Sequence, residues 1–193
     1  MAMRSFQKLL EGYEKCLVID LQKNRKDMLF VNIFAVLIAV AMAVPMHFYI
    51  PFSTFFTGLE NLGAYLIRMF VLLAMMFAYL FLHELVHGAA MKLCGTKKVR
   101  YGFCGMYAYA GSEDYYSRGA YIFIALAPVV LFLAVFAVAN LLVPLSWFWT
   151  IYLLQIINVS GAAGDIYVTC RFLRMPKDIL IKDVGTSMEA YQK

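Results

Sequence analysis

His83-Glu84-Leu85-Val86-His87 lies near the end of a long apolar run and is the most informative stretch of the chain. Two histidines four residues apart share one face of a helix, one turn apart, which suits two ligands of one zinc ion. The glutamate between them can act as general base on water at the remaining zinc position. The alternatives are a chance match to this motif or two interfacial histidines. Ionisable groups inside apolar helices are costly and therefore usually functional, so we expect a zinc site with Glu84 as its catalytic residue.

The composition indicates an integral membrane protein. Hydrophobic residues make up 63% of the 193 residues, charged residues only 15%, and the mean hydropathy is +0.73. An apolar helix must cover about 30 Å of hydrocarbon at about 1.5 Å per residue. Four runs are long enough to do so: 28–50, 66–93, 120–143 and 147–170. The sequence therefore predicts an all-α integral membrane protein with four transmembrane helices.

The basic residues predict the orientation of these helices. Every Lys and Arg except Arg68 lies before the first span, from the last two residues of span two to the start of span three, or after span four. The two remaining connections, 51–64 and 144–146, contain none. By the positive-inside rule, both termini and the central loop lie on the cytoplasmic side of the inner (cell) membrane. This topology accounts for the net charge of +5, so the charge gives no support to nucleic-acid binding.

The predicted organisation has three segments. Residues 1–27 are predicted to be a cytoplasmic amphipathic segment, a helix lying on the anionic inner face of the membrane, because apolar residues recur there at helical spacing between basic ones. A solvated helix packed on the bundle explains this pattern equally well. Residues 28–170 form a four-helix transmembrane zincin-like domain, and residues 171–193 form a polar cytoplasmic tail.

The connection 96–119 predicts a short cytoplasmic β-hairpin-like loop directly after the histidine helix. Tyr101, Phe103, Tyr107 and Tyr109 alternate with small or polar residues around glycines, which is typical of paired strands. We expect these four residues to form a substrate-binding loop, because a protease must bind its peptide in an extended form and strand addition achieves this. The alternative is an aromatic loop resting among the lipid headgroups.

A catalytic zinc ion normally has three protein ligands, and no histidine follows His87. Asp165 is the preferred third ligand, because it lies deep in span four at about the depth of His87. Asn158, two turns earlier, is expected to orient Asp165 or to stabilise an oxyanion. Glu113 or Asp114 in the polar loop is the competing ligand. A buried pair that only holds the bundle together is the alternative role for Asp165.

Pro128 and His47 occupy informative positions along the spans. Pro128 in span three predicts a kink whose freed carbonyl needs a partner in a neighbouring helix. His47 lies at the opposite depth from the HExxH motif, so we expect an interfacial histidine and not a ligand.

The order of these motifs resembles a bacterial family of membrane zincin peptidases (a domain of unknown function) and, distantly, the site-two intramembrane metalloproteases. The resemblance runs from about residue 66 to 191. It is carried by the HExxH motif, Tyr101-Gly102-Phe103, the loop 107–109, Ala125-Leu126-Ala127-Pro128, Asn158 with Gly164-Asp165-Ile166-Tyr167, and Pro176-Lys177-Asp178. It implies zinc on His83, His87 and Asp165, with Glu84 as acid and base. Unlike the site-two enzymes, this chain has Ala127 where they have glycine before the proline, and glycine precedes Asp165 instead of following it.

We therefore expect a zinc-dependent, membrane-embedded metalloprotease (a hydrolase of the HExxH class). Its cofactor is Zn²⁺, and its partners are a peptide or membrane-protein substrate and the lipid bilayer. Hydrolysis is expected at or just within the cytoplasmic interface. The alternative is a non-catalytic zinc-binding membrane protein that serves as partner or chaperone of other membrane proteins. Neither the substrate nor the oligomeric state follows from the residues.

Overall fold

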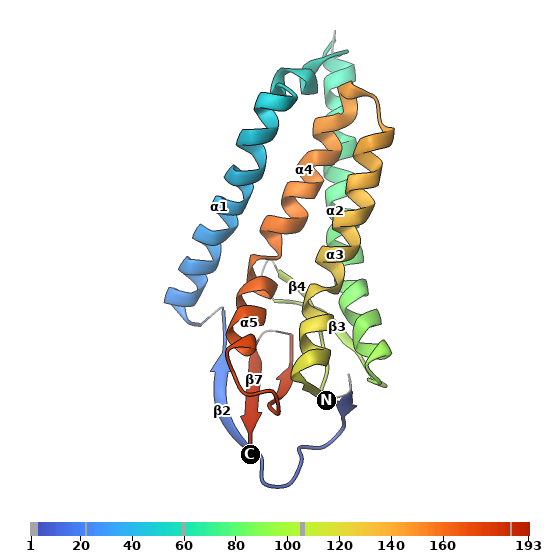
Figure 1. Ribbon diagram of the computed structural model, residues 1–193. Coiled ribbons are helices and arrows are strands. Elements are labelled where there is room, and N and C mark those ends of the chain that lie inside the picture. Colours follow the sequence, from blue (N-terminus) through green and yellow to red (C-terminus); the bar gives the residue numbers. More distant parts are fainter. Residues whose placement is uncertain (1–3, 22, 59–60, 105–106, 186) are drawn as a thin grey trace. The chain divides into compact units, whose positions relative to one another are not determined.

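The computed structural model describes residues 4–21, 23–58, 61–104, 107–185 and 187–193. Most of them are helical (Figure 1). The helices are α1 (Arg25–Tyr49), the 3₁₀ helix η1 (Phe52–Phe56), α2 (Leu62–Leu93), α3 (Arg118–Leu142), α4 (Leu145–Gly161) and α5 (Ala163–Leu173). Within the described residues, α1, α2, α3 and the α4–α5 stretch are long and apolar enough to cross a membrane. The expectation of four such segments is confirmed.

The prediction of an all-α fold is wrong, because two antiparallel sheets accompany the helices. The larger sheet has the order β1-β5-β6-β7-β2 and the smaller one pairs β3 with β4. Their strands are β1 (Ser5–Phe6), β2 (Glu14–Ile19), β3 (Arg100–Cys104), β4 (Tyr107–Gly111), β5 (Tyr115–Ser117), β6 (Leu180–Asp183) and β7 (Met188–Gln192). Residues from the first segment, the central loop and the tail thus meet in one sheet, and β2 lies beside β7 (Figure 1).

The helix expected within 1–27 is also wrong. Leu17 and Ile19 contact the core while Val18, between them, is 52% exposed. This alternation has the period of a strand and is satisfied by pairing with β7, in which Val18 lies opposite Glu189. The partner of this strand lies near the other end of the chain. The short apolar run by itself therefore fits either period.

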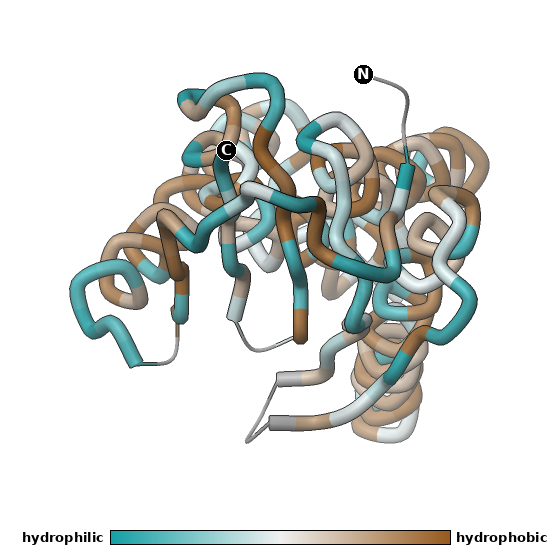
Figure 2. The backbone as a smooth tube through the Cα atoms, turned by 90° about the horizontal axis from the view of Figure 1, so that it is seen from below, coloured by the Kyte–Doolittle hydropathy of each residue, from teal (hydrophilic) through white to brown (hydrophobic). Residues whose placement is uncertain are grey.

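The β-hairpin predicted in the central loop is confirmed. Arg100–Cys104 pairs antiparallel with Tyr107–Gly111, and Gly102 lies opposite Tyr109 in the register. The two strands are visible as a separate ribbon (Figure 1). Figure 2 shows the contrast in hydropathy on which the prediction of the helical spans depends, with mostly brown helices and largely teal connections.

The chain divides into two compact units. Unit 1 contains Met1–Val31, Leu82–Pro128 and Gly164–Lys193. Its core brings Met91 of α2, Tyr121 of α3 and Phe172 of α5 together with Ile181 of the sheet, and all four side chains are buried. The HExxH motif therefore belongs to the unit that contains the larger sheet.

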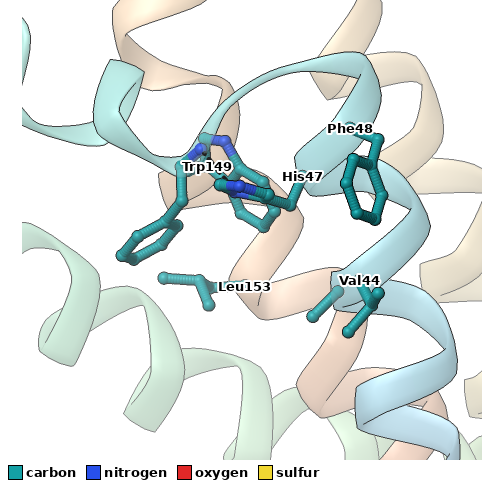
Figure 3. Close-up of a pocket in the computed structure, with 7 residues that line it drawn as sticks. Val44, His47, Phe48, Trp149 and Leu153 are labelled. Atoms are coloured by element: carbon teal, nitrogen blue, oxygen red, sulfur yellow. Dashed lines mark hydrogen bonds between the residues drawn. The ribbon is translucent and has the colours of Figure 1, made fainter.

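Unit 2 contains Asn32–Phe81 and Val129–Ala163. An aromatic cluster anchors one end of α4, where the Trp149 indole N–H donates to the carbonyls of Ile50 (3.0 Å) and Pro51 (3.2 Å). His47 lies beside Trp149 in a mainly apolar pocket (Figure 3). Its Nδ1 accepts a hydrogen bond of 3.1 Å from the backbone N–H of Phe52, which ties η1 to the end of α1.

Candidate metal centre

His83 and His87 occupy one face of α2 within unit 1, as their spacing predicts. Their imidazole rings are 4.8 Å apart between centroids, and the side chains are only 11% and 12% exposed. Both Nε2 atoms point to one carboxylate oxygen, Oδ2 of Asp165, at 3.7 Å from His83 and 3.8 Å from His87. The structure thus brings together the three residues that the sequence analysis selected as ligands.

Asp165 reaches this position through a break in the expected fourth span. The helix ends as α4 at Gly161, and Ala162 has φ −81° and ψ 12° before α5 begins at Ala163. Asp165 therefore lies in the first turn of α5, where the helix dipole favours a negative charge. Glycine at 161 and 164 weakens a continuous helix. A Cβ at Gly161 would meet no described atom within 4 Å, so this glycine is not needed for close helix packing.

The three side chains fit a zinc ion. Distances of 3.7 and 3.8 Å are too long for direct hydrogen bonds between Asp165 and the histidines. Ligand atoms about 2.0–2.1 Å from a tetrahedral zinc ion would be separated by about 3.3 Å, so a small adjustment suffices. The potential ligand atoms of His83, His87 and Asp165 all lie within 4.8 Å of one another. Two imidazoles and one carboxylate are also the donor set of some catalytic zinc sites.

The ring nitrogen of His87 that does not face Asp165 makes a hydrogen bond of the kind found in metal-binding histidines. Its Nδ1 lies 2.9 Å from the backbone oxygen of Ile124 in α3. A carbonyl oxygen can only accept, so Nδ1 carries a proton, and in the neutral ring Nε2 then presents its lone pair toward Asp165. Zinc-binding histidines commonly donate their other N–H in this way.

Glu84 lies between the histidines and beside the hairpin. The backbone N–H of Ala110 in β4 interacts with its carboxylate. Tyr101 of β3 packs over the next turn of α2, because a Cβ at Gly88 would overlap the tyrosine hydroxyl. The hairpin is therefore attached to the helix that carries the motif, beside the predicted general base.

The hairpin is also held by the turn between β6 and β7. A Cβ at Gly111 would lie 2.7 Å from the Val184 carbonyl carbon, and the Ser112 N–H donates to the Asp183 carbonyl at 2.9 Å. The ring of Tyr109 lies against Gly185, which has a φ of +92° and could not carry a side chain there. Two of the predicted substrate-binding residues, Tyr101 and Tyr109, thus fix the hairpin. Phe103 is 81% exposed, and Tyr107 pairs with Cys104 in the ladder.

Asp183 lies near the candidate centre, although the sequence does not predict it there. Its Oδ1 accepts a hydrogen bond of 2.8 Å from the Gly185 N–H, and it interacts with Tyr121, His87 and Asp165. Burial raises the pKa of Asp183 to about 6. A single acidic residue in a polar tail carries no sequence signal of this kind, because only the pairing of β6 with β5 and β7 brings it under the site.

Of the remaining sequence candidates, Glu113 and Asn158 have described partners of their own. The competing ligand Glu113 forms surface ion pairs with Arg100 (2.9 Å) and Lys182 (2.7 Å). Asn158 is fully buried in unit 2, where its amide donates to the Val129 carbonyl at 3.1 Å and accepts from the Tyr79 hydroxyl at 3.1 Å. These bonds tie α4 to α2 and α3, and the role of Asn158 toward an oxyanion stays a prediction.

The fold and the site define a mainly helical protein with a His-Glu-x-x-His motif and a downstream aspartate. The chain belongs to the family described as "Putative zincin peptidase", whose model matches residues 76–180 and so includes the histidines, the hairpin and Asp165. It is also 31% identical over 114 residues to an uncharacterised 24.7 kDa protein of Pyrococcus woesei. That alignment covers 56% of this chain and 49% of the relative, so the chain spans about half of that protein. No solved structure matches the chain.

Proposed function

We propose that the chain is a zinc-dependent metalloprotease embedded in the membrane, which hydrolyses peptide bonds at or just within the cytoplasmic interface. The convergence of His83, His87 and Asp165 beside Glu84 carries this proposal. These ionisable side chains belong to helices apolar enough to lie in lipid, where such groups are costly unless they have a function. The family to which the chain belongs is named for zinc peptidases.

His83, His87 and Asp165 would hold the zinc ion as its three protein ligands. When bound, zinc polarises the scissile carbonyl and increases the acidity of water. Among the described residues, the group that could hold a metal contains no fourth His, Cys, Asp or Glu. Three protein ligands are typical of catalytic zinc sites, while structural sites usually have four.

Glu84 would act as general base and then as general acid. Its carboxylate would take a proton from the attacking water and deliver it to the leaving amine. The Ala110 N–H is suited to orient this carboxylate, since it interacts with it from β4. Hydrolysis of a membrane-derived peptide by the purified protein, with Glu84→Gln as the matched control, tests the proposal.

We expect both termini and the connection 96–119 to lie in the cytoplasm. The test uses single-cysteine variants in intact cells and a membrane-impermeant maleimide. A cysteine at position 61, in the lysine- and arginine-free connection, should be labelled. Native Cys16, which is exposed on β2, should be labelled only after the cells are made permeable. Labelling of Cys16 in intact cells would contradict this orientation.

The hairpin offers an edge for an extended substrate. Ala110 lies opposite Tyr101 in the register, yet its N–H interacts with Glu84. Ala110 and Tyr101 therefore form a non-hydrogen-bonded pair of the ladder. Because the two kinds of pair alternate, every second residue of β4 directs its N–H away from β3. Ala108 is the next such residue. A peptide that adds to this edge of β4 would run toward Glu84 and would be held extended for cleavage.

Ala108→Pro should raise KM for a peptide substrate several-fold, because proline removes the N–H that this edge offers. Its zinc content should remain that of the wild type. Phe103→Pro probes the opposite edge of the hairpin, since Phe103 lies opposite Ala108 and directs its N–H away from β4. A rise in KM for Phe103→Pro alone would place the substrate on β3 instead. Unchanged KM in both variants would exclude strand addition to the hairpin.

A further inference from the structure

Pro128 lies inside α3, three residues after Ala125 and four after Ile124. In a regular α-helix the N–H of residue 128 would donate to the carbonyl of residue 124. Proline has no N–H, and its ring also keeps that carbonyl from its usual place in the helical ladder. The Ile124 oxygen therefore has no partner at residue 128. Because Ile124 is only 1% exposed, water cannot readily take the partner's place.

The freed carbonyl is the one that His87 uses. The Ile124 oxygen lies 2.9 Å from His87 Nδ1, and both residues belong to unit 1. The freed carbonyl expected from Pro128 thus has a partner on α2. The partner is the second histidine of the HExxH motif.

We propose that Pro128 is a positioning residue for the metal centre, which acts by freeing the Ile124 carbonyl to bind His87. This inference rests on the zinc site of the proposed function. The bond requires hydrogen on Nδ1, so it fixes the tautomer in which Nε2 has a lone pair. It also fixes the plane of the ring, so that Nε2 points to Oδ2 of Asp165 at 3.8 Å. Outer partners of this kind commonly control metal affinity.

Pro128→Ala tests the inference, because alanine restores the N–H and is the best helix former. The new N–H would compete with His87 for the Ile124 oxygen. We expect zinc affinity, measured by chelator competition, to fall by about tenfold to a hundredfold, the usual effect of losing an outer partner. The Tm of the metal-free protein should stay the same or rise. A proline with only a structural role in the fold would change zinc affinity and Tm in the same direction.

A second readout is independent of zinc. The chain has three histidines, so ¹⁵N NMR of histidine-labelled, metal-free protein can resolve their tautomers. Wild-type His87 should carry its proton on Nδ1, while Pro128→Ala should show a share of the Nε2–H form. Pro45→Ala is the matched control, because Pro45 also lies inside a helix, α1, but in unit 2. It should leave both zinc affinity and the His87 tautomer unchanged.

Different results would overturn the positioning role of Pro128 and the zinc site of the proposed function. Wild-type zinc affinity and an unchanged His87 tautomer in Pro128→Ala would overturn the role of Pro128 alone. An equal loss of zinc affinity in Pro45→Ala would also overturn it. A wild-type protein that binds no zinc would overturn the proposed function, and the tautomer measurement would still decide what Pro128 does.

Discussion

Glu84→Gln is expected to lower hydrolysis of a membrane-derived peptide by at least about a hundredfold, the usual scale for loss of a general base. Glutamine has nearly the same shape and can still interact with the Ala110 N–H, but it cannot accept a proton from water. Zinc content should therefore remain that of the wild type. The measurement is peptide cleavage in detergent or lipid, with metal analysis on the same samples.

Glu113→Gln is the matched control for this prediction. It makes the same chemical change at a carboxylate that forms only surface ion pairs with Arg100 and Lys182, and such pairs contribute little. Cleavage should be unchanged in this variant. Full activity in Glu84→Gln with zinc still bound would exclude the protease and favour a non-catalytic zinc protein.

Asp165→Ala should reduce zinc affinity by at least about a hundredfold, because loss of a direct ligand should exceed the effect of losing an outer partner. Alanine is the best helix former, so the first turn of α5 should persist. The measurement is zinc per chain after gel filtration, followed by chelator competition on the protein that retains metal. Cleavage should fall with the zinc content, in contrast to Glu84→Gln, where activity is lost and the metal remains.

Glu113→Ala tests the competing ligand under the same conditions. It should keep its zinc, because the Glu113 carboxylate contacts Arg100 and Lys182 in the described structure and not the histidines. Normal zinc in Asp165→Ala together with zinc loss in Glu113→Ala would assign the third position to the loop carboxylate.

The sequence alone determined the helical segments and which ionisable residues could form the candidate metal centre. Long apolar runs can satisfy their backbone only as helices, which is a local property of the chain. The i, i+4 spacing is local too, because helix geometry places His83 and His87 on one face whatever the rest of the fold is. Asp165 could be selected because a carboxylate in an apolar span is rare. The hairpin was predicted from residues close enough in the chain to pair directly.

The larger sheet was decided by tertiary structure. β2 pairs with β7 at the other end of the chain, and no local pattern specifies a partner so distant. The pairing of β6 with β5 and β7 likewise brings Asp183 of the polar tail close enough to interact electrostatically with His87 and Asp165. The break at Ala162 was hidden as well, because two glycines in an apolar run can mark either a close helix contact or an interruption. At Pro128 both kinds of information are needed. The sequence shows that residue 128 has no N–H and so predicts a free carbonyl at Ile124, but only the packing of α3 on α2 brings His87 to that carbonyl.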